Sequence, residues 1–534
     1  MDQTEVDYVV VGGGSAGSVL AGRLSEDPAV TVGLLEAGGG GNSAIVNTPA
    51  GVIAMLPTKL NNYGYETVPQ PGMANRLGYQ PRGKCLGGSS AINAMVYIRG
   101  HKWDYDHWAS LGNAGWSYDE LLPYFRRAEN NETLNGPLHG KGGPLNVSQL
   151  RTDNPFHDIY LEAARQAGYP ITDDFNGENQ EGIGIYQVTQ KNGERWSAAR
   201  GYLFPHLGKR NNLHVQTGAV ATRILFEGKR AIGIEYRQGG QTKTLKARRE
   251  VLLAGGAFNS PQLLMLSGVG PGAHLQQHGI PVLHDLAGVG QNLQDHPDFI
   301  FSYKAKSLDL IGFSVPGSIR MTGELARYIS KRRGLLTSNF AEGGGFLKTD
   351  PNLPAPDVQL HFVVAIADNH ARTLHWGHGF SCHVCVLRPK SRGHVGLLSK
   401  DPLAAPEIDP AFFKDPDDLE TMVKGFKMTR KLLNSPALAQ HVTKDMYTAD
   451  IHSDDDIRAI LRARTDTVYH PVGTCKMGFD KLAVVGASLR VHGLQGLRVV
   501  DASIMPTLVG GNTNAPTIAI AEKAVDMIRA DAEA

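Results

Sequence analysis

Residues 8–17 read Tyr8-Val9-Val10-Val11-Gly12-Gly13-Gly14-Ser15-Ala16-Gly17, an apolar, β-rich run that passes directly into a glycine-rich turn. Apolar residues then recur at helical spacing through Leu24, and a second apolar run ends at Glu36. A strand, a helix and a second strand in this order, with the glycines at the first turn, predict a βαβ unit with parallel strands. This part of the chain is therefore predicted to have an α/β fold.

The spacing Gly12-x-Gly14-x-x-Gly17 is typical of a dinucleotide site. The first glycine permits the tight turn, the second lets the backbone approach a pyrophosphate, and the third allows the helix to pack closely on the strand. The free N–H groups at the helix N-terminus would face the phosphates. Glu36 would accept hydrogen bonds from a ribose, and its charge disfavours the 2′-phosphate of NADP. These features do not separate NAD from FAD, and a glycine-rich turn in another α/β fold is the alternative.

Composition excludes several other classes of protein. Lys and Arg total 53 against 52 for Asp and Glu, so no global charge favours nucleic acid. Four cysteines are too few to crosslink 534 residues, and residues 1–5 lack the features of a secretion signal, so we expect a cytoplasmic protein. Cys382 and Cys385 have metal-type spacing but no second pair, and we expect buried thiols there and no metal site.

Strand patterns divide the chain into two kinds of segment. Residues 251–256 again lead from a strand into a helix, and residues 212–236 and 242–251 alternate in the manner of hairpin strands. Residues 300–465 contain further strand-like runs and look like a second domain inserted into the first. We predict that the first domain comprises residues 1–155, 190–300 and 466–534, and that the second comprises 156–189 and 301–465.

A candidate site of chemistry lies near the C-terminal end, where Tyr469-His470-Pro471 is followed by Gly511-Asn512-Thr513-Asn514. Histidine, with an unperturbed pKa near ~6.5, suits a base that takes a hydroxyl proton. The amide of Asn514 could donate a hydrogen bond to the resulting oxygen and also cap a helix that begins near Pro516. Spacing alone leaves open a satisfied core histidine and an asparagine that is only a helix cap.

Further motifs carry a resemblance that covers most of the chain. The runs at 83–93, 256–270, 288–296 and 499–503, with the His470 motif, resemble those of the glucose-methanol-choline (GMC) oxidoreductase family. The resemblance implies a discontinuous, Rossmann-type FAD-binding domain (α/β) with an inserted substrate domain (α+β) built on an antiparallel sheet. It also implies that His470 is the base and Asn514 its partner.

The same resemblance implies which residues bind the cofactor. Some members attach FAD covalently through a histidine at the position of Ile92, so non-covalent FAD is expected here. The expected FAD-binding residues are Gly12, Gly14, Ser15, Ala16, Gly17, Glu36, Ala37, Gly83, Gly87, Gly88, Ser90, Asn93, Ala94, Val96, Val220, Ala254, Gly255, Asp501, Ala502, Asn512 and Thr513.

The implied reaction is oxidation of a primary alcohol to its aldehyde, with proton abstraction at His470, hydride transfer to flavin N5 and a quinone as electron acceptor. The alternatives are an alcohol oxidase that reduces O2 to H2O2 and a hydroxynitrile lyase on the same flavin scaffold. The exact alcohol and the oligomeric state do not follow from the sequence.

Two segments of the inserted domain have two interpretations each. Glu342, which stands among glycines, is expected to line the substrate cavity, with a solvated loop acid as the alternative. The amphipathic stretch 318–333 ends in Lys331-Arg332-Arg333, which predicts either a lid over the pocket or a peripheral contact with a membrane.

Overall fold

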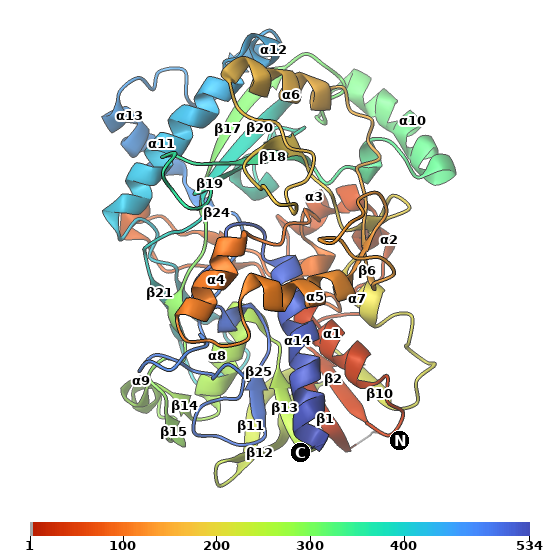
Figure 1. Ribbon diagram of the computed structural model, residues 1–534, viewed down its shortest axis with the longest axis vertical. Helices are drawn as coiled ribbons and strands as arrows, with labels where there is room; N and C mark the ends of the chain where they lie inside the picture. The colour runs from red at the N-terminus through yellow and green to blue at the C-terminus, as the bar shows by residue number, and fades with distance from the viewer. Residues whose placement is uncertain (1–3, 534) are drawn as a thin grey trace.

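The computed structural model describes residues 4–533, which form two seven-stranded sheets and several smaller ones in a single elongated molecule (Figure 1). In the first sheet, the buried strands β1 (Glu5–Val11) and β2 (Val32–Glu36) are parallel, as the sequence predicts. The strand order is β10-β2-β1-β13-β12-β11, and β25 pairs with β13. The other members are β10 (Leu213–Thr217), β11 (Val220–Glu227), β12 (Arg230–Gln238), β13 (Gln241–Leu253) and β25 (Leu497–Val499).

Helices from opposite ends of the chain lie side by side on this sheet (Figure 1). They are α1 (Ser15–Leu24) and α14 (Asn514–Glu533). The fully buried carboxylate of Glu522 on α14 holds Arg23 of α1 at 2.8 Å. A buried charge is tolerated only when it is paired, so this ion pair fixes the C-terminal helix against the N-terminal one.

The second sheet is antiparallel, with the order β23-β17-β20-β19-β18-β7 and β24 paired to β17. Alternate side chains of a strand point to opposite faces. One face, with Phe301 and Phe362, packs in a hydrophobic core against α11 (Pro416–Leu433), and the opposite face, with Ile300 and His361, lines a cavity. The strands are β7 (Gly182–Ile185), β17 (Pro297–Ala305), β18 (Ala341–Leu347), β19 (Val358–Val363), β20 (His378–Val386), β23 (Val442–Asp445) and β24 (Asp466–Thr467).

The two sheets confirm the expected fold class, an α/β domain with an inserted antiparallel domain. Their strands come from alternating stretches of the chain, although β24 of the second sheet lies in the segment 466–534 that is predicted for the first domain. β17 begins at Pro297, a little before the predicted boundary at residue 300. The domain boundaries themselves stay a prediction.

Helix α10 (Val315–Lys331) contains most of the amphipathic stretch and lies at the outer edge of the molecule (Figure 1). It buries Gly317, Glu324 and Tyr328, but none of its residues lines the large cavity described below. The structure therefore gives no support to a lid in this position. No helix within residues 4–533 has the length and apolarity that a bilayer span requires.

The predicted buried thiols on β20 are confirmed. Cys382 and Cys385 are both fully buried and unpaired, and they belong to different hydrophobic clusters because they lie on opposite faces of the strand.

Candidate active site

A cavity of about 1100 Å³ lies where the carboxyl ends of the parallel strands meet the second sheet. Val11, Leu35 and Leu253 line it at the ends of β1, β2 and β13, and Ile300 and His361 line it from the second sheet. In doubly wound sheets, ligands bind beyond the carboxyl ends of the strands. The cavity therefore lies at the position that the βαβ unit predicts.

Bare backbone forms the part of the cavity next to α1. A Cβ on Gly12, where φ is +100°, would lie 2.6 Å from the Ala254 carbonyl oxygen, and one on Gly17 would lie 1.8 Å from the Gly12 oxygen. Gly14 is the N-cap of α1, with no side-chain cap and no acidic residue in the first turn. A Cβ on Gly88 would lie 2.6 Å from the Cα of Gly14, so the two glycine loops touch directly. This cradle leaves the helix N-terminus open to an anion such as a pyrophosphate.

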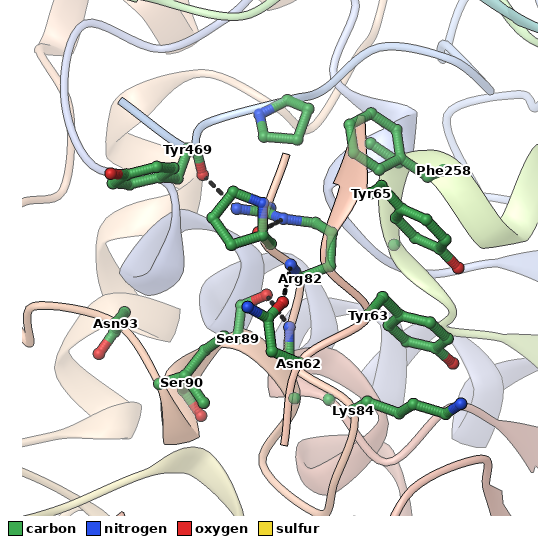
Figure 2. Close-up of a pocket in the computed structure, with 18 of the residues that line it drawn as sticks. Asn62, Tyr63, Tyr65, Arg82, Lys84, Ser89, Ser90, Asn93, Phe258 and Tyr469 are labelled. Carbon is green, nitrogen blue, oxygen red and sulfur yellow. Dashed lines mark hydrogen bonds between the residues drawn. The ribbon is translucent and has the colours of Figure 1, made fainter. Parts of the chain in front are cut away.

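Glu36 lies beside this cradle. Its carboxylate accepts hydrogen bonds from the backbone N–H groups of Gly13 at 2.8 Å and Gly38 at 2.7 Å, which fix its orientation at the cavity wall. Figure 2 shows two further wall residues, Tyr63 and Tyr65, which stack with ring centroids 4.9 Å apart. A carboxylate with spare lone pairs beside the open helix suits a ribose next to a pyrophosphate, so these residues fit a dinucleotide.

Most of the expected FAD-binding residues line the cavity. Gly17 and Gly87 do not, because both serve packing: Gly17 lies against Gly12, and a Cβ on Gly87 would meet Ser197. The carboxylate of Asp501 is used entirely within the protein, since it accepts hydrogen bonds from Gly256, Ser260 and Ser503. Those that line the cavity are Gly12, Gly14, Ser15, Ala16, Glu36, Ala37, Gly83, Gly88, Ser90, Asn93, Ala94, Val96, Val220, Ala254, Gly255, Asp501, Ala502, Asn512 and Thr513.

The expected pairing of His470 with Asn514 is wrong. Nε2 of His470 lies 3.1 Å from Nδ2 of Asn512, whereas Oδ1 of Asn514 accepts a hydrogen bond from the Ser15 hydroxyl at 2.7 Å. Asn514 is the first residue of α14 and ties that helix to α1. Asn512, which sequence reasoning assigned to the cofactor, therefore occupies the place predicted for Asn514.

Hydrogen bonds at both ends fix the tautomer of His470. Nε2 of His296 lies 3.1 Å from the Leu387 carbonyl oxygen, which can only accept, so this nitrogen carries the proton. Nδ1 of His296 is then an acceptor for Nδ1–H of His470, 3.0 Å away. His470 consequently presents the lone pair of Nε2 to the amide of Asn512.

The amide of Asn512 is fixed in turn by the second sheet. Its Oδ1 accepts a hydrogen bond from Nε2 of Gln359 on β19 at 3.1 Å, so its Nδ2 group is the one that faces His470. Gln359 is fully buried and also donates to the Tyr186 hydroxyl at 3.2 Å. The lone pair of the histidine and the N–H of the amide therefore converge on one point of the cavity.

Burial and the groups around His470 favour its neutral form. Burial lowers the pKa of His470 well below its usual value, and the neighbouring His296, His361 and Arg82 lower it further. The Arg82 guanidinium lines the cavity and donates a hydrogen bond to the Tyr469 carbonyl at 2.7 Å (Figure 2). The site thus keeps a free base and a nearby positive charge together.

Asp295 positions the backbone of the two histidines. Its Oδ1 accepts hydrogen bonds from the N–H groups of His470 and His296, both at 2.9 Å. Burial raises the pKa of Asp295 to about 6, although several hydrogen bonds oppose the effect. Sequence reasoning assigned roles to neither Asp295 nor His296, although their Asp-His pair stands within one of the quoted motifs.

The expected role of Glu342 in the substrate cavity is also wrong. Its neighbour Ala341 lines the cavity, so Glu342, the next residue of β18, points to the other side. There the fully buried carboxylate contacts Nε2 of His157 at 2.6 Å and accepts a hydrogen bond from the Ser338 hydroxyl at 2.6 Å. Its role is to join α6 (Phe156–Ala167) to the start of β18.

Comparisons with known proteins agree with this geometry. Models of the GMC oxidoreductase N- and C-terminal domains match residues 6–298 and 389–521. The chain is 46% identical over 526 residues to an alcohol dehydrogenase [acceptor] of Pseudomonas putida, which covers 98% of this chain and 95% of the relative. It is also 46% identical to an oxygen-dependent choline dehydrogenase of Burkholderia multivorans, over 99% of this chain and 94% of the relative.

Solved structures give the same result for the fold and the cofactor. Pyridoxine 4-oxidase from Mesorbium loti superposes with a TM-score of 0.88 at 31% identity and 98% coverage of both chains. Formate oxidase from Aspergillus oryzae, whose structure was solved in a study of FAD modification, superposes with a TM-score of 0.91 at 29% identity and covers all of this chain. The chain therefore belongs to the GMC oxidoreductase family and is an FAD-dependent oxidoreductase that acts on CH–OH donors.

Proposed function

We propose that this protein oxidises a primary alcohol to the corresponding aldehyde, with His470 as the base and Asn512 as its partner. The observation that carries the proposal is the fixed direction of the hydrogen bond between them, in which an unprotonated Nε2 meets an amide N–H at 3.1 Å. A hydroxyl group that lies beside the pair, within hydrogen-bond distance of both nitrogens, can donate its proton to His470 and accept a hydrogen bond from Asn512.

The reaction needs a base that is free at neutral pH and a donor for the oxygen that loses its proton. The lowered pKa keeps Nε2 of His470 unprotonated. Nδ2 of Asn512 donates to the developing alkoxide, and Arg82 adds a positive charge nearby. The proton stays on His470, whose Nδ1–H remains bonded to His296.

FAD, when it is bound by the open helix N-terminus of α1, Glu36 and the glycine loop at 87–93, supplies the hydride acceptor at flavin N5. Ile92 lines the cavity in that loop and has no nucleophilic atom, which supports non-covalent binding.

For the electron acceptor we propose a quinone. The alcohol dehydrogenase [acceptor] to which the chain is similar supports this choice. Val468 favours O2 as a second candidate, because this small residue lines the cavity two positions before the base and leaves room for a diatomic molecule. A hydroxynitrile lyase would use the same base without net redox.

One anaerobic experiment separates these functions. The visible spectrum of the purified yellow protein is recorded while octanol and benzyl alcohol are added in turn. We expect bleaching of the flavin band, slow recolouring in air and fast recolouring with a soluble ubiquinone analogue. Fast recolouring in air would establish an oxidase, and a flavin that no primary alcohol bleaches would refute the proposed function.

We also propose a peripheral contact with a membrane through α10. Its apolar residues Val315, Ile319, Leu325 and Ile329 fall on one face at helical spacing, and Ile319 and Ile329 are 69% and 68% exposed. Phe313 and Trp376, which are joined by a β-bridge, extend this apolar face and are also exposed. The loop of Trp376 also carries Ala371, which lines the cavity, so an apolar substrate could enter from the bilayer side.

Three arginines at the end of α10 contribute little to this contact. Arg327 and Arg333 both pair with Asp153, and Arg332 pairs with Glu194. We therefore expect binding to vesicles that does not depend on anionic lipid and that persists in high salt. All four cysteines are free thiols, which supports the cytoplasmic side as the place of contact.

A flotation assay with phosphatidylcholine vesicles tests the contact. An Ile319→Glu/Ile329→Glu variant should lose flotation, whereas Phe479→Glu, which changes an equally exposed residue elsewhere, should keep it. If the parent protein does not float with the vesicles, the proposed contact is refuted.

A further inference from the structure

The wall of the cavity on the second sheet carries histidines with carboxylates behind them. Nδ1 of His383 lies 2.6 Å from Oδ2 of Asp298. His383 lines the cavity, but Asp298, which is only 3% exposed, does not. Ile300 pairs with His383 across β17 and β20, and Asp298 lies on the same face two residues before Ile300. The imidazole therefore stands between the carboxylate and the substrate.

The same arrangement occurs a second time. Nε2 of His370 lies 2.9 Å from Oδ2 of Asp466, and His370 lines the cavity while Asp466 does not. Nδ1 of His370 contacts the Tyr469 hydroxyl at 2.7 Å, so both ring nitrogens are engaged. Asp298 and Asp466 thus each have a histidine that covers the carboxylate and can share a proton with it.

The remaining lining gives no counter-charge to a cation. The acidic residues that line the cavity are Glu36, Glu66 and Asp501, and none of them belongs to the second sheet. Glu36 and Asp501 are held at the cofactor end, as described above. The charged side chain nearest to His470 in the lining is Arg82, which is positive.

An aromatic cage is the other way to hold a quaternary ammonium group. On the side of the second sheet, Phe340 and Tyr469 are the aromatic rings, apart from histidine, that line the cavity. Tyr63, Tyr65 and Phe258 form a cluster of rings, but this cluster lies at the Glu36 end, on the far side of Arg82 (Figure 2). The other lining residues here carry no charge: Asn339 is polar, and the rest are apolar, among them Ile300, Ala341, Val363, Ala365, Ile366, Ala367 and Val468.

From these contacts we infer that the active site selects uncharged primary alcohols over choline-like cations, and that the His383–Asp298 pair sets this selectivity. When the pair holds one proton more than a neutral imidazole and a carboxylate, it has no net charge, whether it is an imidazolium with a carboxylate or an imidazole with a carboxylic acid. Burial raises the pKa of Asp298, which favours the shared proton over a bare anion. A cation would have to displace that proton before it gained a counter-charge. The inference rests on the proposed function and names its substrate class.

The test compares choline with 3,3-dimethylbutan-1-ol, which replaces the nitrogen by carbon and keeps the shape. For the parent holoenzyme we expect kcat/KM for the uncharged alcohol to exceed that for choline by ~10-fold or more, a difference of ~1.4 kcal/mol. Choline oxidised as efficiently as its isostere would overturn the inference. If neither compound nor any other primary alcohol bleaches the flavin, it is the proposed function that fails.

Variants assign the selectivity to the pair. His383→Ala uncovers Asp298, and we expect the preference to shift towards choline by ~10-fold or more. His383→Ala/Asp298→Asn has the same enlarged cavity without the charge, and should return the preference to the uncharged alcohol. Equal ratios in these two variants would show that cavity volume, and not charge, sets the preference, and would overturn the inference.

A second readout does not need turnover. Calorimetry of the holoenzyme with the methyl ethers of the two alcohols, which have no hydroxyl to lose, measures binding alone. We expect the uncharged ether to bind more tightly to the parent and the cationic ether to gain affinity in His383→Ala. Asp298→Asn, which is nearly isosteric, should keep the order of the parent even if His383→Ala fails to fold. Tighter binding of the cationic ether by the parent would also overturn the inference.

Discussion

Replacement of Asn512 by Ala tests the site most directly, because the structure and the sequence pattern name different asparagines. Nδ2 of Asn512 is the one side-chain amide donor within hydrogen-bond distance of His470 among the described residues. Removal of a single preorganised donor to a developing oxyanion typically lowers the rate by ~10²–10³-fold, or ~2.7–4 kcal/mol. We therefore expect anaerobic flavin reduction by octanol in Asn512→Ala to be at least ~10²-fold slower.

Asn514→Ala is the matched control, two residues away and of identical chemistry. It removes the acceptor of the Ser15 hydroxyl and leaves the contact between His470 and Asn512 intact. We expect its reduction rate to stay within a few-fold of the parent, with a small loss of thermal stability because α1 and α14 lose one hydrogen bond. Stopped-flow absorbance gives the rates, and the flavin spectrum confirms that both variants retain FAD. A normal rate in Asn512→Ala together with a slow rate in Asn514→Ala would refute the assignment.

Three further predictions follow from groups around the same cavity. Because the pKa of His470 is lowered and the neutral form is the base, kcat/KM should stay constant as the pH falls through 6.5 and decline only at lower pH; a decline centred on 6.5 would contradict the buried environment. Burial lowers the pKa of His296 and of His361 to about 3, so the unfolded chain binds more protons than the folded protein between pH 6.5 and pH 3. Each of the two histidines should therefore lower the free energy of unfolding by ~1.4 kcal/mol for every pH unit that the pH falls in this range. A falling midpoint of urea unfolding measures the effect. Glu342→Gln should lower the melting temperature and leave the KM for octanol unchanged. A raised KM with an unchanged melting temperature would show that Glu342 contributes to the substrate site.

Local sequence patterns predict the elements that depend on near neighbours. The turn after β1 needs glycine at Gly12 because φ is +100°, and at Gly17 because no side chain fits against the preceding turn. Such constraints act within a few residues, so the sequence alone predicts the βαβ unit and the glycine turn at which the cofactor binds. His470 is identifiable for a different reason, since the surrounding motif resembles a known family.

The choice between Asn512 and Asn514 depends on partners that are distant in the sequence. Ser15 on α1 donates a hydrogen bond to Asn514, and Gln359 on β19 donates one to Asn512. Both asparagines stand at the start of an apolar helix, and no local pattern distinguishes them. The same limit applies to Glu342, whose direction is set by the register of β18 and not by the glycines around it.

A backbone carbonyl determines which nitrogen of His470 is free to act as the base. The Leu387 oxygen, just beyond β20, accepts a proton from Nε2 of His296 and can never donate one. That single fact makes Nδ1 of His296 an acceptor, makes Nδ1 of His470 a donor and leaves Nε2 of His470 free. His296→Gln offers either an oxygen or an N–H to His470, so it should weaken this control of the tautomer. We expect it to slow flavin reduction without changing KM, and an unchanged rate would show that the imidazole of His470 is oriented by Asn512 alone.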